Sequence, residues 1–494
     1  MSPGSPLFLY IVSGVLLGIG FVVPTLWVTV FIGVLVFLVA VSRTETLKSA
    51  LLGSLITFTI KALFATSMYW SAYPLLISEI SLGRIELIII GLYWMIVSLV
   101  IGFGGLLAGA GLWYLKNKHP IKVFLIGLPF ILVLSEWLGA FMFSILTYGP
   151  GGSINAGYSL GHIGYLLGEH SGLILLAQFG GVYVLSLLAA TVGGLVWFIY
   201  HSQSKMFFYY TLAFTVIGFG ATAHLNWLKV ESAEDKTVAI INTKFGGGYR
   251  DSLEQQEYEF AAVSKAVAAA LETKPDYLVL PEGVGLNPHN LTPKAAYNLF
   301  RFNYSDPETV VVFTSTAKLS SEKLTTVRSI IYDGKNKTSW YADKQYLTPQ
   351  GEFLPYLYTG FLRLFGQTDV LARIDKRSYF KPGPQASQVD FSADIPGILF
   401  CYGVVDPVRV RQAVQGRENV PFVAHPFSHA WFHDSKILRS EIDNMLKIQA
   451  VWSRVSIISA GNMGEGALYT AGGKKVIPEI IKEDKDWQIG ALNL

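Results

Sequence analysis

Long apolar segments with very few charged residues fill the first part of the chain, and a mixed polar and apolar pattern follows them. A membrane-spanning helix needs about 20 apolar residues. Segments of about this length occur at 7–41 (two short helices separated at Pro24), 50–77, 87–115, 123–146, 172–200 and 207–225. The pattern predicts a polytopic α-helical membrane domain over residues 1–228 with about seven transmembrane helices. We expect the first apolar run to be retained, because it is too long for a cleaved signal and lacks a basic leader.

The second part of the chain, residues 229–494, has the pattern of a soluble α/β domain. Short β-rich runs are expected as strands at 237–242, 277–280, 310–313, 329–332, 398–400, 422–424 and 455–459. Apolar residues recur at helical spacing over 253–272, and a further helix is expected at 440–454. Strands that alternate with helices indicate a layered α/β fold.

The basic residues of the membrane domain concentrate in alternate loops. The basic residues of these loops are Arg43, Lys48, Lys116, Lys118, Lys122 and Lys205, whereas the loop 78–86 has Arg84 against Glu79 and Glu86. The intervening loop of residues 148–171 has neither Lys nor Arg. By the positive-inside rule the N-terminus is expected in the cytoplasm. An odd number of spans then places residues 229–494 outside the cytoplasm, which predicts a multi-pass protein of the inner membrane with a periplasmic domain.

Composition argues against nucleic acid as a partner and favours membrane lipids. Hydrophobic residues make up 51% and charged residues 15% of the chain, whereas a soluble protein carries about 25% charged residues. Membrane lipids are therefore expected partners. The net charge of +3 and the lack of a basic patch argue against nucleic acid. We expect a monomer.

Cys401 is the only cysteine in the chain and directly follows a predicted strand. In an oxidising compartment a lone cysteine cannot serve as a structural disulfide, although a free cysteine is often a small buried side chain. Glu282 and Lys344 also follow apolar or β-rich runs. A thiol nucleophile needs a base, which Glu282 can provide, and a positive charge for an oxyanion, which Lys344 can provide. The trio predicts acyl transfer through a thioester.

The membrane domain contains two further candidates for function. Glu136 lies inside a predicted span, where a carboxylate is costly, so it has either a functional role or a structural ion partner. The loop of residues 147–171 is rich in glycine and apolar residues. It either dips into the membrane interface or serves as a flexible connector.

Three histidines, His425, His429 and His433, are spaced four residues apart. On a helix they would share one face and could bind a metal ion. Pro426 favours a strand end and a loop instead, so we expect no metal site.

The segments around Glu282, Lys344 and Cys401 resemble the Glu-Lys-Cys signature of the nitrilase (carbon–nitrogen hydrolase) superfamily. The segment 429–434 is similar to the superfamily's Asn-Asp-Ala-Trp-Phe stretch, and 459–464 to a later turn. This resemblance implies an αββα sandwich and an enzyme that uses no cofactor. It also identifies Glu352 as the family's second glutamate and Tyr402 as the tyrosine after the nucleophile, both supporting substrate or oxyanion.

A nitrilase-like domain that follows a polytopic membrane domain resembles the apolipoprotein N-acyltransferase family. The segments 135–138 and 179–186 are similar to membrane-domain motifs of that family. The resemblance implies a ping-pong reaction in which Cys401 takes an acyl chain from a phospholipid. The chain then passes to the N-terminal amine of a diacylglyceryl-cysteine lipoprotein, so the implied partners are a phospholipid donor and a diacylated lipoprotein acceptor.

The sequence departs from this family at several points. Gly403 stands where the family has a glutamate, no tryptophan follows the first strand of the second domain, and the charged tail at 479–487 cannot span a membrane. Two alternatives therefore stay open: a membrane-tethered amidase with water as acceptor, and an inactive nitrilase-like scaffold. The aromatic segment 351–371 is expected to form a lid.

Overall fold

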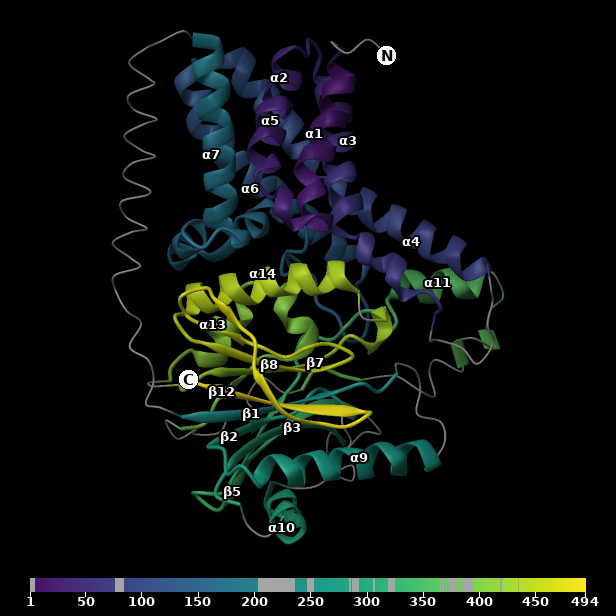
Figure 1. Ribbon diagram of the computed structural model, residues 1–494. Coiled ribbons are helices and arrows are strands. Elements are labelled where there is room, and N and C mark those ends of the chain that lie inside the picture. The colour runs from purple at the N-terminus through teal and green to yellow at the C-terminus, as the bar shows by residue number, and fades with distance from the viewer. Residues whose placement is uncertain are drawn as a thin grey trace.

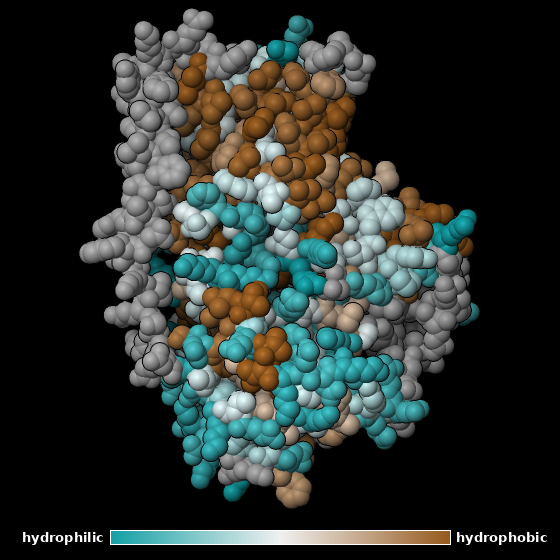
Figure 2. All heavy atoms as spheres, viewed as in Figure 1, coloured by the Kyte–Doolittle hydropathy of each residue, from teal (hydrophilic) through white to brown (hydrophobic). Residues whose placement is uncertain are grey.

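The computed structural model describes the chain except for residues 1–4, 76–83, 203–235, 247–252, 284–285, 287–292, 305–306, 319–324, 365, 367, 370, 373–379, 384–393, 418–419 and 434. An upright helical bundle stands on a layered α/β domain (Figure 1). The bundle's exposed surface is hydrophobic, whereas the surface of the α/β domain is mostly hydrophilic (Figure 2). The division into a membrane domain and an α/β domain agrees with the predicted fold class.

The bundle consists of helices in the order of the predicted spans. They are α1 (Pro6–Val22), α2 (Thr29–Ser42), α3 (Leu47–Ala65), α4 (Arg84–Gly102), α5 (Gly104–Lys118), α6 (Ile121–Leu146) and α7 (Gly181–Ser202). Within the described residues, 47–65, 84–118, 121–146 and 181–199 are long and apolar enough to cross a membrane, while α1 and α2 are shorter. The predicted span 207–225 lies outside the described residues, so the number of about seven stays a prediction.

Three predicted spans have different boundaries in the structure. The span expected at 50–77 ends at Ala65, and the 3₁₀ turn η2 (Ser67–Ala72) follows it. The span expected at 87–115 is split into α4 and α5 at Phe103. A straight helix over both would be about 50 Å long, well above the roughly 30 Å of the hydrocarbon core, and α4 slopes outward from the base of the bundle (Figure 1). The span expected at 172–200 starts later, because the 3₁₀ turn η4 (Leu173–Phe179) precedes α7.

Small residues allow the helices of the bundle to approach closely. A side-chain carbon added at Gly109 of α5 would lie 2.6 Å from the Ala50 carbonyl oxygen and 2.9 Å from Ser54 Oγ, both on α3. Close backbone approach of this kind drives helix association in membranes, where the hydrophobic effect between helices is lost.

The second domain contains strands on both sides of a central apolar layer. The strands are β1 (Thr237–Thr243), β2 (Tyr277–Val279), β3 (Val310–Lys318), β4 (Thr325–Asp333), β5 (Thr338–Asp343), β6 (Gly397–Ile398), β7 (Val423–Ser428), β8 (Ile457–Asn462), β9 (Leu468–Tyr469), β10 (Lys475–Val476), β11 (Glu479–Glu483) and β12 (Trp487–Asn493). Its helices are α9 (Leu253–Leu271), α10 (Pro293–Tyr304), α11 (Tyr356–Leu364), α13 (Arg409–Val414) and α14 (Lys436–Ser453).

These elements form an αββα sandwich, as the alternation of buried residues shows. In β1, Ala239 and Ile241 pack with α9 and α10, whereas Val238 and Ile240 face the strands β7 and β8 of the other half. Neighbouring side chains of a strand point to opposite faces, so β1 contributes to two layers. The halves β1–β5 and β6–β9 are joined by the pairing of Thr243 with Asn462, and α13 and α14 cover the outer face of β7 and β8.

Several short elements were not predicted from the sequence. They include β5, α10, α11, α13 and the strands β9 to β12. The charged tail does not form a membrane helix: β11 and β12 form a hairpin, and β12 pairs with β1 over its whole length. The other predicted strands and helices are present with shifts of a few residues.

The two domains share one hydrophobic core. Helix α14 lies beneath the bundle (Figure 1), and its buried residues belong to the same cluster as those of the membrane helices. The loop of residues 147–171, expected as a flexible connector or an interface loop, is a packed segment rather than a flexible connector. Tyr158, Leu160 and Ile163 are buried, and the 3₁₀ turn η3 (Ile163–Glu169) packs on α7 and α14.

We expect Gly109→Ala to lower the stability of the bundle by about 1–3 kcal/mol, because the added methyl group would push α5 away from α3. The measurement is the midpoint of thermal unfolding in detergent. Gly360→Ala is the matched control, because nothing lies within 4 Å of a side-chain carbon at Gly360. An unchanged midpoint for Gly109→Ala would contradict the close packing described above.

Candidate active site

Lys344 lies at the centre of a cluster of ionisable side chains. It directly follows β5, and its side chain is only 1% exposed. Its Nζ lies 3.0 Å from Glu282 Oε1 and 2.7 Å from Glu352 Oε1. Burying an ammonium group is costly unless opposite charges compensate it, and here two carboxylates do so.

The two carboxylates reach Lys344 from different elements. Glu282 follows β2 at the carboxyl end of that parallel strand, and its backbone N–H donates to the Phe427 carbonyl of β7 at 3.4 Å. Glu352 lies in the turn after β5, where its Oε2 accepts from the Thr348 backbone N–H at 2.7 Å. The two halves of the sandwich therefore meet at this site.

Cys401 begins the 3₁₀ turn η5 (Cys401–Val405), which we call the nucleophile turn and which follows β6. Its thiol is partly buried and donates to the Ser428 carbonyl at 3.7 Å. The thiol also lies close enough to the Glu282 carboxylate for that carboxylate to raise the pKa of Cys401. The structure thus places Cys401 within electrostatic reach of Glu282 and Lys344, and their roles as a catalytic trio stay a prediction.

Burial, with the carboxylates of the site, favours the protonated form of the thiol. Burial raises the pKa of the Cys401 thiol, and Glu282 raises it further, while Lys344 lowers it. Burial also raises the pKa of the Glu282 carboxyl, against the influence of Lys344. Burial alone would lower the pKa of Lys344, but Glu282 and Glu352 raise it above its ordinary value. The resting site therefore contains a fixed ammonium, a neutral thiol and a carboxylate with raised proton affinity.

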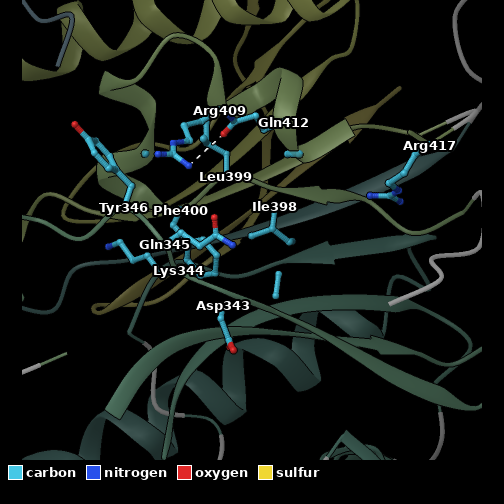
Figure 3. Close-up of a pocket in the computed structure, with 13 residues that line it drawn as sticks. Asp343, Lys344, Gln345, Tyr346, Ile398, Leu399, Phe400, Arg409, Gln412 and Arg417 are labelled. Carbon is cyan, nitrogen blue, oxygen red and sulfur yellow. Dashed lines mark hydrogen bonds between the residues drawn. The ribbon is translucent and has the colours of Figure 1, made fainter. Parts of the chain in front are cut away.

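Tyr402 and Gly403 follow Cys401 in the nucleophile turn. The Tyr402 ring stacks on Tyr346, with centroids 5.3 Å apart, and burial raises the pKa of its phenol. Gly403 borders a cavity of about 150 Å³ beside the site. Arg409 and Gln412 of α13 also line this cavity and hydrogen-bond to each other (Figure 3). A side-chain carbon at Gly403 would contact only Leu399 Cδ1, at 3.3 Å.

The nucleophile turn is held by residues outside the ionic cluster. The backbone N–H and the hydroxyl of Ser159 both donate to the Val405 carbonyl, at 3.0 and 2.6 Å. Gln449 Nε2 of α14 donates to the Val404 carbonyl at 2.6 Å. Ser159 belongs to the membrane domain, so this domain directly fixes the segment that carries Cys401.

Glu136 is paired inside the bundle. Its Oε1 lies 2.9 Å from Lys61 Nζ, and both side chains are almost completely buried. Lys61 was not predicted from the sequence as a functional residue, although a signal exists: Lys61 and Glu136 are each the only charged residue in their predicted spans. Ser159 and Gln449 had no comparable signal.

A family model agrees with this arrangement of the membrane domain. Residues 13–195 match the model of the apolipoprotein N-acyltransferase N-terminal domain. This part of the chain is similar to the N-terminal domain of the apolipoprotein N-acyltransferase family. The match confirms the resemblance drawn from the sequence and supports a membrane-associated acyltransferase of this general kind.

Solved structures similar to the chain come from the nitrilase superfamily. A mutant amidase of this superfamily from Nesterenkonia is 13% identical, covers 53% of this chain and 93% of its own, and has a TM-score of 0.35. A carbon–nitrogen hydrolase superfamily protein from Xanthomonas campestris, with an arsenic adduct in its active site, is 13% identical, covers 53% and 91%, and has a TM-score of 0.36. A comparison with curated protein sequences found no match.

The three candidate histidines do not assemble into a metal site. His425 lies in β7 and contacts the Cys401 carbonyl through Nε2 at 3.3 Å, His429 follows β7, and His433 contacts the Pro74 carbonyl at 3.0 Å. Among the described residues, no group of three His, Cys, Asp or Glu side chains could hold a metal ion.

Two of these histidines make folding sensitive to acid. Burial lowers the pKa of His425 to about 4 and that of His429 to about 3. Both are neutral in the folded protein at neutral pH, while the unfolded chain binds protons near pH 6.5. Above about pH 6.5 both histidines are neutral in the folded and in the unfolded chain, so they do not change the free energy of unfolding. As the pH falls toward 4, only the unfolded chain binds protons on them, and the folded protein loses stability.

We therefore expect the melting temperature in detergent to fall between pH 6.5 and pH 4. His429→Phe should reduce this fall, since each buried histidine contributes roughly 3 kcal/mol of destabilisation at pH 4. His433→Asn, at an exposed position, controls for the loss of a histidine as such. The same pH dependence in His429→Phe and the parent protein would rule out this origin.

Proposed function

We propose that this protein is an apolipoprotein N-acyltransferase that carries the acyl chain on Cys401. The observation that supports it most is the position of the thiol. Cys401 lies beside the buried Lys344 and its two carboxylates, on a turn that Ser159 of the membrane domain holds directly. A nucleophile at the junction of the two domains suits substrates that are themselves lipids.

The proposed reaction has two balanced half-reactions. In the first, Glu282 takes the thiol proton of Cys401 while sulfur bonds to the ester carbonyl carbon of the phospholipid. Lys344 stabilises the oxyanion, the carbon–oxygen bond breaks, and the lysophospholipid alkoxide takes the proton from Glu282. In the second, the lipoprotein amine attacks the thioester, Glu282 accepts an amine proton, and the released thiolate recovers it.

Apolar surface near the site supports a lipid donor. Helix α11, within the segment expected as a lid, exposes Leu357, Phe361 and Leu364. It lies beside the outer end of α4, which also exposes large apolar side chains (Figure 1). Tyr93 of α4 contacts Tyr358 of α11, with ring centroids 6.0 Å apart.

The proposed orientation places the sandwich in the periplasm. Lys48 and Lys122 lie near the starts of α3 and α6, and both helices run from there toward the sandwich. Lys116 donates to backbone carbonyls at the end of α2, including that of Thr44 at 2.9 Å. Basic residues therefore gather at the end of the bundle remote from the sandwich, which by the positive-inside rule is the cytoplasmic end.

The defining experiment incubates the purified protein with a phospholipid labelled in its acyl chain and a diacylated lipopeptide. We expect a labelled thioester and then a triacylated peptide, and Cys401→Ala should reduce both at least about 10³-fold. The assignment of the thioester is direct, because the chain has no other cysteine. Lys482→Gln, at an exposed position where the side chain pairs with Glu272, is a suitable control.

Other products would point to the alternatives. Release of free fatty acid or ammonia without a triacylated peptide would indicate a membrane-tethered amidase-like hydrolase with water as acceptor. No thioester with any donor would indicate an inactive scaffold. Either result would contradict the proposed transferase.

The proposal also predicts a pH dependence for thioester formation. Glu282 must be ionised to accept the thiol proton, and its pKa is raised above 4.5, so the rate should rise with pH across a midpoint above that value. Glu352 is one cause of the raised pKa. In Glu352→Gln, the rate of thioester formation is plotted against pH relative to that variant's own maximal rate. The rise of this curve on the acidic side should therefore move to lower pH. A shift to higher pH would contradict Glu282 as the base.

A further inference from the structure

A network of buried hydrogen bonds begins at the ion pair inside the membrane bundle. Glu136 Oε1 accepts from Lys61 Nζ at 2.9 Å and from the Ile163 backbone N–H at 2.7 Å. Glu136 Oε2 accepts from the Ser186 hydroxyl at 2.8 Å, and the Ser186 oxygen accepts from the Gly164 N–H at 3.0 Å. One carboxylate thus fixes the first two residues of η3 to α3, α6 and α7.

The other end of this network is the nucleophile turn. Tyr165, two residues after Ile163 in η3, has its hydroxyl 2.6 Å from Ser159 Oγ. Ser159 in turn donates to the Val405 carbonyl at 2.6 Å. All of these side chains are buried, so water does not compete for the hydrogen bonds and the network has a defined geometry.

We propose that Glu136 is a positioning residue for Cys401. It acts as the acceptor that fixes η3, and η3 holds the nucleophile turn through Tyr165 and Ser159. This inference rests on the proposed function in one respect, namely that Cys401 is the nucleophile. It goes beyond that function by assigning a role in catalysis to a carboxylate within the bundle.

The hydrogen bonds of Glu136 favour this role over simple stabilisation of the bundle. A buried ion pair contributes little net stability compared with apolar residues of similar volume. Two of the three donors to Glu136, however, come from groups other than Lys61: the Ile163 backbone and the Ser186 hydroxyl. Loss of the acceptor would leave the buried Ile163 N–H unpaired, which is unfavourable and favours movement of η3.

Two double variants separate the acceptor from the ion pair. Lys61→Met with Glu136→Gln removes both charges but keeps an oxygen that can accept from Ile163. Lys61→Glu with Glu136→Lys keeps an ion pair but places an ammonium, which cannot accept, beside the Ile163 N–H. Ser13→Ala is a matched control, because Ser13 donates to the Gly33 carbonyl in the same bundle without contact to η3.

Two measurements are made on each full-length variant in detergent. The first is the rate of thioester formation with a labelled phospholipid, divided into kcat and KM for the donor. The second is the rate of alkylation of Cys401 by iodoacetamide as a function of pH. Because Cys401 is the only cysteine, alkylation reports on its position and ionisation even if the protein does not act on phospholipids.

The charge-swapped variant should lose at least about 30-fold in kcat with little change in KM, since displacement of a nucleophile by about 1 Å can cost 10²-fold. Its alkylation at neutral pH should be faster, because the released thiol becomes hydrated and ionises more easily. The uncharged variant should stay within about threefold of the parent in both measurements. Ser13→Ala should match the parent protein.

Three results would overturn the inference. The first is a folded charge-swapped variant with parental kcat and alkylation. The second is an uncharged variant as impaired as the charge-swapped one, which would assign the effect to the ion pair. If the charge-swapped variant does not fold, Ser159→Ala tests the inference in its place. The third contradicting result would be an unchanged kcat and an unchanged alkylation rate in Ser159→Ala. A parent that forms no thioester would reject the proposed function, while the alkylation comparison would still test the positioning role.

Discussion

The site depends on the burial of the Lys344 ammonium between two carboxylates. A single buried positive charge would be expelled or deprotonated, but Glu282 and Glu352 both contact it within 3.0 Å. Burial and the Glu282 carboxylate both oppose ionisation of the Cys401 thiol. Deprotonation of the thiol must therefore accompany its attack on a carbonyl, and Lys344 is already in place for the charge that moves to oxygen.

This ionic cluster determines how the sandwich must be built. Glu282 comes from the half formed by β1 to β5, and Cys401 from the half formed by β6 to β9. The two halves must keep a constant separation for these residues to meet. The apolar layer between them, with Ile240, Val312 and Ile458 fully buried, provides that separation because packed interiors deform very little.

The sequence predicted the chemical residues better than their supports. Glu282 and Cys401 each follow a short strand, and residues at the ends of strands gather at one edge of a sheet, so their meeting could be anticipated. The pairing of Glu136 with Lys61 spans 75 positions, and the contact of Ser159 with Val405 spans 246. Such contacts depend on how the bundle sits on the sandwich, and no local pattern encodes that. Strand β11 was missed because all of its residues are exposed, which leaves no alternation to detect.

The nucleophile turn explains why both domains are needed in one chain. A short 3₁₀ turn cannot pair its own last carbonyl groups, so it needs donors from elsewhere. For Val404 the donor is Gln449 of the sandwich helix α14, and for Val405 it is Ser159 of the membrane domain. Adjacent carbonyls of the same turn are thus satisfied by different domains. The position of the thiol is consequently set by the junction itself, and a sandwich without the bundle would leave the Val405 carbonyl without the donors that fix it here.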